Sequence, residues 1–158
     1  MKTLILIRHA MPEDGFGLPD FERNLTTDGK SDATKIGESW KSEGFCPDFI
    51  LSSAAVRAKQ TAELIAEACA YPKSVVLEKQ LYSTYEMALL DRIHALDDAH
   101  QRVVLVNHNP AISGLVEMLT NDYIPMRQGT QIEVSFAADK WSEIEEGKGK
   151  ILKTTHAI

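Results

Sequence analysis

The sequence is poor in cysteine, in basic charge and in long apolar runs. Its 158 residues include two cysteines, Cys46 and Cys69, and neither has the closely spaced Cys or His partners that a zinc site needs. The apolar run Leu4–Ile7 ends at Arg8 and is too short for a signal peptide, and no run approaches the ~20 residues of a membrane span. We therefore expect a cytoplasmic protein with reduced thiols, without a metal or other cofactor and without a membrane partner.

Acidic residues outnumber basic ones by 23 to 17, which gives a net charge of −6. This balance disfavours a nucleic-acid partner, which needs a basic surface, although it allows a small basic pocket. Apolar residues make up 44% of the chain and charged residues 25%, which is the composition of a globular protein. Because the chain has no linker and no internal repeat, we expect one domain over residues 1–158.

Strand and helix signals alternate along the chain, which predicts an α/β fold. The first and fourth predicted strands are continuously apolar, as expected when helices cover both faces of a parallel sheet. We expect a three-layer α/β/α sandwich whose central sheet is mostly parallel, with an antiparallel pair at one edge. The predicted strands span residues 3–7, 49–51, 75–77, 103–106, 131–136 and 150–153, and the predicted helices begin near residues 26, 55, 85 and 109.

Arg8 and His9 follow directly after the first predicted strand. A neutral imidazole nitrogen can attack phosphorus near neutral pH, and an adjacent guanidinium can hold two phosphoryl oxygens while it stays charged. Their position matters more than the pair itself, because ligands of open α/β sheets bind beyond the carboxyl ends of the strands. Taken alone, the pair also fits two solvated residues at a strand end.

Three further basic side chains are expected near the same end of the sheet. Arg57 falls in the first turn of the second predicted helix, where the helix dipole disfavours a cation unless an anion binds there. His108 follows the fourth strand, and Arg23 ends the long loop 10–25. Each also has a structural explanation: Arg57 as an exposed arginine, His108 as a histidine bonded to local backbone, and Arg23 as a solvated loop arginine. Together with the first pair they form a nucleophile and a phosphate clamp, in which arginines replace a Mg²⁺ ion.

This set of residues resembles the histidine phosphatase superfamily, in its phosphoglycerate-mutase-like branch. Arg8-His9, Arg57 and His108 stand in the family's order, and the R-x-L-T-x-x-G run of Arg23–Gly29 is similar to the SixA-type phosphohistidine phosphatase subgroup. The resemblance implies that His9 accepts the phosphoryl group and that His108 hydrogen-bonds it. It also implies that the phosphoryl oxygens are bound by Arg8, Arg23 and Arg57.

The sequence departs from larger members of this family, which place an acidic proton donor just after the third strand. Glu86 is the carboxylate nearest to that position, and Ser83-x-x-Glu86 is also a capping-box pattern for the third helix. We expect the capping role for Glu86 first and the role of proton donor second. Glu13 and Asp14, in the first loop, are weaker candidates for a donor. A missing acid suits a P–N bond, whose imidazole leaving group can depart already protonated.

The sequence therefore predicts a metal-independent phosphatase that works through a phosphohistidine intermediate. Its expected substrate is phosphohistidine on a protein. The alternatives are a phosphatase for small phosphomonoesters and a module that binds a phosphorylated ligand without turnover, whereas a mutase fits least well. The sequence holds no signal for an oligomeric state.

Overall fold

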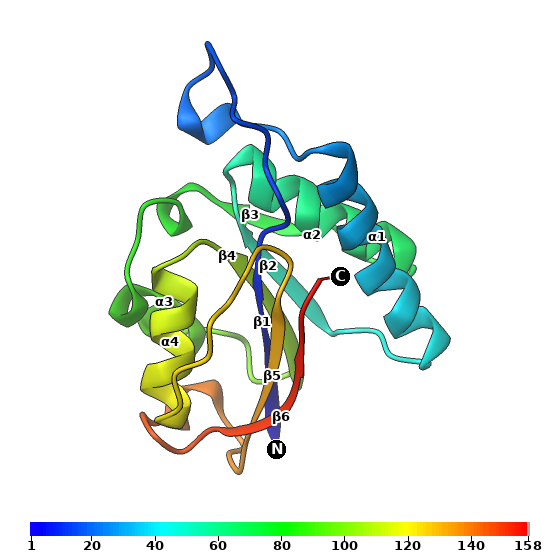
Figure 1. The fold of residues 1–158 in the computed structure, drawn as a ribbon. Helices are drawn as coiled ribbons and strands as arrows, with labels where there is room; N and C mark the ends of the chain where they lie inside the picture. Colours follow the sequence, from blue (N-terminus) through cyan, green and yellow to red (C-terminus); the bar gives the residue numbers. More distant parts are fainter. Residues whose placement is uncertain (158) are drawn as a thin grey trace.

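The computed structural model describes residues 1–157, and a six-stranded sheet forms its centre (Figure 1). The strand order is β3-β2-β4-β1-β5-β6. The first four strands in this order are parallel, whereas β5 runs antiparallel to β1 and β6 runs antiparallel to β5. This confirms the mostly parallel sheet with an antiparallel edge. The strands are β1 (Lys2–Arg8), β2 (Phe49–Ser53), β3 (Val76–Glu78), β4 (Arg102–Asn107), β5 (Gln131–Phe136) and β6 (Lys150–Thr155).

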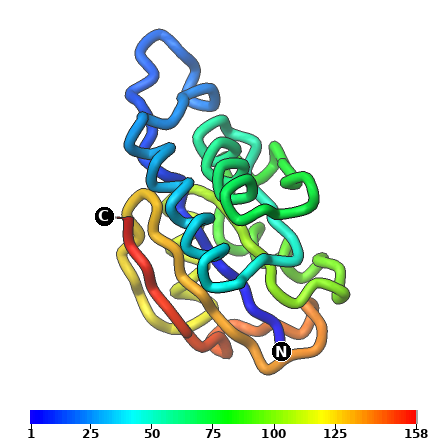
Figure 2. The backbone as a smooth tube through the Cα atoms, turned by 90° about the vertical axis from the view of Figure 1, so that its right-hand side faces the viewer, coloured from blue at the N-terminus to red at the C-terminus, as the bar shows by residue number. Residues whose placement is uncertain are grey.

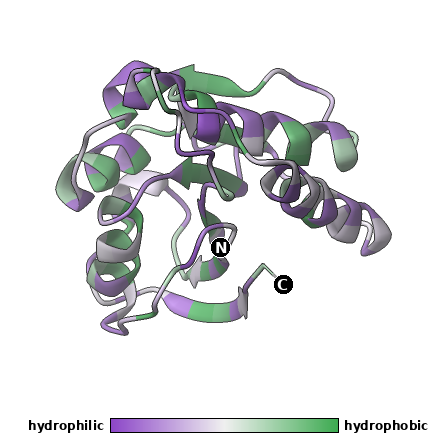
Figure 3. Ribbon diagram, turned by 45° about the horizontal axis from the view of Figure 1, so that its top comes forward, coloured by the Kyte–Doolittle hydropathy of each residue, from purple (hydrophilic) through white to green (hydrophobic). Residues whose placement is uncertain are grey.

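Helices cover both faces of the sheet, so the predicted three layers are confirmed. Figure 1 shows α1 and α2 on one side and α3 and α4 on the other. In Figure 3 these helices alternate between hydrophilic and hydrophobic residues, as expected for helices that pack one face against a sheet. The helices are α1 (Thr27–Ser42), α2 (Val56–Ala68), α3 (Glu86–His94) and α4 (Ala111–Thr120), and short 3-10 turns lie at η1 (Asp20–Glu22), η2 (Lys79–Leu81) and η3 (Trp141–Glu143).

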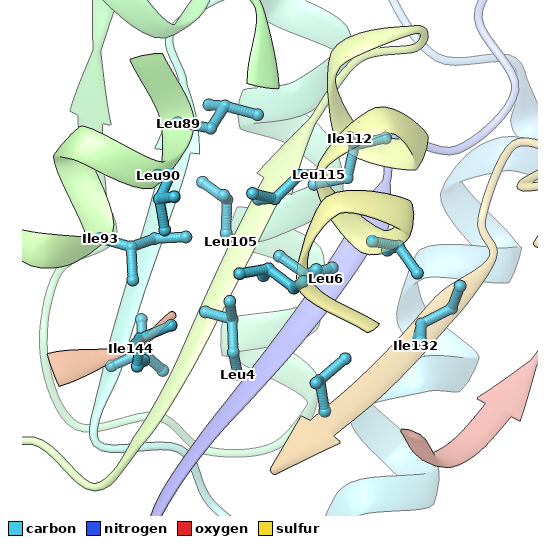
Figure 4. Close-up of a cluster of buried hydrophobic side chains, with 14 of the residues drawn as sticks. Leu4, Leu6, Leu89, Leu90, Ile93, Leu105, Ile112, Leu115, Ile132 and Ile144 are labelled. Atoms are coloured by element: carbon cyan, nitrogen blue, oxygen red, sulfur yellow. The ribbon is translucent and has the colours of Figure 1, made fainter. Parts of the chain in front are cut away.

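The continuous apolar run in β1 contributes side chains to two separate hydrophobic cores, one on each face of the sheet. Leu4 and Leu6 pack beneath α3 and α4, in the cluster that Figure 4 shows. Ile5 and Ile7 point to the opposite face and pack beneath α1 and α2. All four side chains are at most 3% exposed. Because successive side chains of a strand point to opposite faces, both faces of β1 are buried and neither can be polar.

The helices begin close to the predicted positions. Thr26 caps α1, because its hydroxyl oxygen accepts a hydrogen bond from the Gly29 N–H at 2.9 Å. Helix α3 begins at Glu86, one residue after the predicted start, and ends at His94. The chain turns after it, where the Asp97 carboxylate accepts a bond from the Ala99 N–H at 2.8 Å.

The carboxyl ends of three neighbouring strands lie side by side. Arg8 at the end of β1 pairs with Asn107 at the end of β4, and β2 pairs with β4 up to Ser52. The loop that follows β1 rises beyond these strand ends and returns to α1 (Figure 2). Residues from three distant parts of the sequence therefore meet at one edge of the sheet. Within residues 1–157, no helix has both the length and the apolarity that a membrane crossing requires.

Candidate active site

His9 lies at the first position after β1 and is only 4% exposed. Its Nδ1 lies 2.8 Å from the Ala10 carbonyl oxygen. Because a carbonyl oxygen only accepts hydrogen bonds, Nδ1 carries the proton and Nε2 keeps its lone pair. Burial is the largest cause that lowers the pKa of His9 to about 4, and the charges of Arg57 and Arg8 lower it further. His9 is thus a neutral imidazole at pH 7, with Nε2 free to act as a nucleophile.

His108 lies at the equivalent position after β4, and its ring centroid is 5.1 Å from that of His9. Its Nε2 forms a hydrogen bond with the Ser53 hydroxyl at 2.8 Å, which fixes the ring against the end of β2. Its Nδ1 is buried and has no hydrogen-bond partner in the described part of the chain. Burial is the main cause that lowers the pKa of His108 to about 3, and His9 adds to the shift. Both histidines are therefore neutral at pH 7.

Ser52 and Ser53 precede the second predicted helix and have side chains of the type that can cap it, but β2 continues through Ser53, and the residue that caps α2 is Ala55, without a side-chain bond. The Ser53 hydroxyl instead accepts a bond from the Ala55 N–H at 3.2 Å and contacts His108. Its function is to hold a histidine of the site.

Arg57 is the second residue of α2, and only 8% of it is exposed. It donates two hydrogen bonds to Asp20, one to the backbone carbonyl at 2.8 Å and one to the carboxylate at 3.0 Å. The backbone of this turn is tied to the end of β1 by Thr61, which accepts a bond from the Ala10 N–H and donates one to the Arg57 carbonyl. A carboxylate therefore stands beside the cation at this helix end, as the helix dipole favours.

Arg23 and Arg8 bring two further guanidiniums to this edge of the sheet. Arg23 donates from Nε to the Glu13 carbonyl at 2.9 Å and also to the Asp20 carboxylate at 3.0 Å. Arg8 donates to the Met126 carbonyl at 3.0 Å. Its Nε is buried without a partner, and within residues 1–157 Arg8 forms no ion pair. Burial, and secondly Arg57, lower the pKa of Arg8, which indicates a positive site that an anion would stabilise.

Asp20 is the central residue of the site that the sequence reasoning missed. Its carboxylate accepts hydrogen bonds from Arg23, from Arg57 and, at 2.6 Å, from the Tyr82 hydroxyl. These bonds, with that of Tyr82 the largest cause, hold the pKa of Asp20 far below its usual range. The i,i+3 spacing from Asp20 to Arg23 is a local signal for one of these contacts. Sequence gives no signal for the other two, because Arg57 and Tyr82 lie on distant segments.

A hollow of about 390 Å³ opens beside this cluster. Arg57 and His108 line it, together with Asp20, Tyr82 and Tyr85. His9 is not among the lining residues, because its ring lies deeper, next to His108. A hollow of about 690 Å³ between α1 and α2 is larger, but its lining residues include no histidine and no arginine.

Glu86 does not lie in this hollow. It is the first residue of α3, and its carboxylate packs against Gly114 of α4, where a Cβ atom would stand 3.2 Å from Oε2. The predicted capping box is also wrong: the residue that caps α3 is Tyr85, and Ser83 adopts a left-handed conformation with φ of 51°. Glu86 instead places its negative charge in the first turn of a helix, which the helix dipole favours.

The two weaker candidates for a proton donor, Glu13 and Asp14, are exposed on the loop after β1. Glu13 contributes its backbone carbonyl to Arg23, as described above. Among residues 1–157, no group of three or more His, Cys, Asp and Glu side chains is placed to hold a metal ion.

Comparison with known proteins identifies the class to which this fold and this cluster belong. The sequence profile of the histidine phosphatase superfamily (branch 1) matches residues 4–82. This segment runs from the third residue of β1 to beyond β3 and includes Arg8, His9, Arg23 and Arg57. The chain therefore belongs to the histidine phosphatase superfamily.

Solved structures place the fold more narrowly. A candidate phosphohistidine phosphatase SixA from Nakamurella multipartitia superposes with a TM-score of 0.85 at 21% identity, over 99% of this chain and 96% of that one. The protein histidine phosphatase SixA complexed with tungstate gives a TM-score of 0.84 at 20% identity, over 98% of this chain and 96% of that one. A mycobacterial glucosyl-3-phosphoglycerate phosphatase gives a TM-score of 0.66 at 16% identity, over 96% and 97% of the two chains. The fold is that of the SixA-type structures.

Among curated sequences, an uncharacterized chloroplastic protein of Arabidopsis thaliana is 41% identical over 61 residues, or 38% of this chain. The matched segment spans 28% of that relative's own length.

Proposed function

We propose that this protein is a phosphatase whose His9 accepts a phosphoryl group and passes it to water. The observation that carries the proposal is the state of His9: it is buried, neutral and fixed with Nδ1 protonated, so that the lone pair of Nε2 is available. Three guanidiniums and a second neutral histidine stand around it. Membership in the histidine phosphatase superfamily supports the same assignment.

In the first step, the lone pair of His9 Nε2 forms a bond to phosphorus. The bond between phosphorus and the leaving group breaks, and its electron pair goes to the leaving group. Arg8, Arg23 and Arg57 bind the equatorial oxygens, whose charge is spread in a loose transition state. The Nδ1–H bond to Ala10 persists, so the imidazolium that forms is held in its orientation.

In the second step, water attacks the phosphorus of phospho-His9. The P–N electron pair returns to His9 Nε2, and inorganic phosphate is released. The proton of the attacking water leaves with the phosphate or passes to solvent. His108 lies 5.1 Å from His9 between ring centroids, close enough for its ring to bond an oxygen of the same phosphoryl group in both steps.

Phosphohistidine on a protein is the substrate that we favour. Apolar side chains are exposed on the loop after β1 and at the hollow: Phe16 is fully exposed and Leu18 is 48% exposed on the loop, and Tyr85 on the hollow is 63% exposed. Such side chains are typical of a surface that meets another protein. The higher TM-scores with SixA structures than with the glucosyl-3-phosphoglycerate phosphatase point the same way.

A paired turnover assay tests the proposal. A protein that carries phosphohistidine and an aryl phosphate are each offered to the wild type and to His9→Ala. We expect faster hydrolysis of the P–N bond, and a loss in the variant on the order of 10³-fold or more, because the nucleophile is removed. An acid-labile phosphoryl group should be trapped on His9 of the wild type.

Activity that survives in His9→Ala would overturn the mechanism. Faster hydrolysis of the aryl ester would instead favour the phosphomonoesterase. Tight binding of the phosphorylated protein without turnover would favour the binding module.

A further inference from the structure

The Asp20 carboxylate occupies a defined place in the proposed phosphoryl site. It bonds both Arg23 and Arg57, the two guanidiniums that would also hold phosphoryl oxygens. It lies on η1, in the loop that rises beyond the carboxyl ends of the strands, whereas His9 lies at the strand end (Figure 1). In-line displacement places the leaving group on the face of phosphorus that points away from the nucleophile. A phosphoryl group bound to Arg57 and His108 would turn its leaving group away from His9, and Asp20 lines the same hollow as these two residues.

This carboxylate cannot supply a proton to a leaving group. Three donors bond it and keep it ionised, and its nearest neighbours are two cations and the Tyr82 hydroxyl. An alkoxide that forms beside it would gain no proton and would meet a fixed negative charge. The same carboxylate can accept a further hydrogen bond, since a carboxylate offers about four acceptor positions and three are in use. The side chain is 50% exposed, so a ligand can reach it.

A phosphorylated imidazole carries the group that such an acceptor binds. When its second ring nitrogen is protonated, cleavage sends the P–N electron pair to the first nitrogen. The ring then departs as neutral imidazole and keeps its own proton. A hydrogen bond from that second N–H to a carboxylate stabilises this reactive form. No proton from the enzyme is required, and a phosphomonoester offers no equivalent N–H.

We propose that Asp20 is a specificity-determining residue, which accepts the N–H of a phosphoimidazole leaving group and disfavours leaving groups that depart as alkoxides. This inference rests on the proposed function, since it requires that His9 attacks a phosphoryl group held by Arg23 and Arg57. In this proposal, a residue of the loop determines whether the enzyme prefers P–N or P–O substrates. The same nucleophile at the strand ends, His9, attacks phosphorus in both kinds of substrate.

The variant Asp20→Asn tests this role, because it removes the charge and keeps the size of the side chain. Glu22→Gln is the matched control: it makes the same change on the same 3-10 turn, at an exposed residue. Each variant is assayed with N-phosphorylimidazole and with phenyl phosphate, and inorganic phosphate serves as a competitive inhibitor. Because Glu22 is exposed and η1 has no buried residue, Glu22→Gln should unfold at the wild-type temperature. Asp20→Asn weakens the charged bonds to Arg23 and Arg57 and should unfold at a lower temperature, so both variants are assayed at a temperature at which each is folded.

We expect Asp20→Asn to lower kcat/KM for N-phosphorylimidazole on the order of tenfold or more, as for the loss of a charge-assisted hydrogen bond. Phenyl phosphate should be hydrolysed at an unchanged or higher rate, and Glu22→Gln should match the wild type on both probes. An equal loss on both probes, with weaker inhibition by phosphate, would show that Asp20 only organises the two arginines and would overturn the inference. Unchanged selectivity would overturn it as well.

The His9→Ala variant separates this inference from the proposed function. If His9→Ala is inactive while Asp20→Asn keeps its selectivity, the role of Asp20 fails and the phosphatase assignment stands. If His9→Ala hydrolyses N-phosphorylimidazole as fast as the wild type, the proposed function fails, and the role of Asp20 fails with it.

Discussion

The site joins two regions of different character, the strand ends and the loop after β1. His9 and Arg57 stand at the end of a strand and the start of a helix, and they are 4% and 8% exposed. Arg23 and Asp20 stand on the loop, where η1 has no buried residue and Phe16 is fully exposed. Groups on a packed scaffold are held more precisely than groups on a loop. On the proposed function, this comparison leads us to infer that the strand ends would perform the chemistry and that the loop would select the substrate.

Among the substitutions that test this difference between the strand ends and the loop, we expect Arg57→Ala to have the largest effect on kcat/KM. Arg57→Ala should lower kcat/KM on the order of 10²- to 10³-fold and weaken inhibition by inorganic phosphate, because a buried cation of the clamp is removed. Lys59→Ala, on the same helix but paired with Glu63 in solvent, is the control and should have wild-type kinetics. Arg57 would not belong to the clamp if the alanine variant bound phosphate as tightly as the wild type.

Arg23→Ala should have a smaller effect, on the order of tenfold in kcat/KM, because the charge is carried by a loop in contact with water. The side chain of Arg23 is 26% exposed, against 9% for Arg57. The measurement is the ratio of the two losses with one substrate under one set of conditions. If Arg23→Ala lowered kcat/KM as much as Arg57→Ala does, the loop and the strand ends would not differ in function as inferred here.

The strand ends should also make the fold sensitive to acid. In the folded protein the pKa values of His9 and His108 are lowered to about 4 and about 3, whereas a histidine of the unfolded chain has a pKa near 6.5. Between about pH 6.5 and pH 4 the unfolded chain therefore binds more protons than the folded protein. The free energy of unfolding should therefore fall as the pH drops from about 6.5 towards 4, and recover as it rises. Denaturant titrations at pH 7 and pH 5 measure the fall. A double variant, His9→Gln with His108→Gln, should show a flatter dependence.

The smallest effect is expected at the tip of the loop. Phe16→Ser removes an exposed aromatic ring and should lower kcat/KM for a phosphohistidine protein by about five- to tenfold, in the range of a moderate interface contact. Hydrolysis of N-phosphorylimidazole should not change, because Phe16 is fully exposed and is not among the residues that line the hollow. An equal loss on the small probe would show that the tip affects the chemistry and not the partner.

Features of the fold that depend on local pattern could be predicted from the sequence. Continuous apolar runs predicted the buried strands β1 and β4, and the first helix was predicted to begin near Thr26, which caps α1. Arg8-His9 and His108 could be placed at one edge because parallel strands end at the same side of a sheet. The structure brings these residues together as expected.

Features that depend on contacts between distant segments could not be predicted. Asp20 meets Arg57 across 37 positions and Tyr82 across 62, and no periodicity relates residues so far apart. At Glu86 and Ser53 the local sequence was instead misleading, since each residue fits a capping pattern, but the residues that cap α2 and α3 are Ala55 and Tyr85. A capping pattern states only that a bond is possible, whereas tertiary packing decides where the side chain lies.

The base of the loop after β1 is closed by its own backbone. Pro12 and Leu25 form an isolated antiparallel bridge, flanked by hydrogen bonds from Glu13 to Asn24 and from Thr26 to Met11. A loop whose two ends are pinned together can be lengthened or exchanged at small entropic cost. Residues 14–19, which include neither Asp20 nor Arg23, thus form a replaceable part of the loop. On the proposed function, altering this part alone would change the partner and leave Asp20, Arg23 and the proposed nucleophile His9 in place.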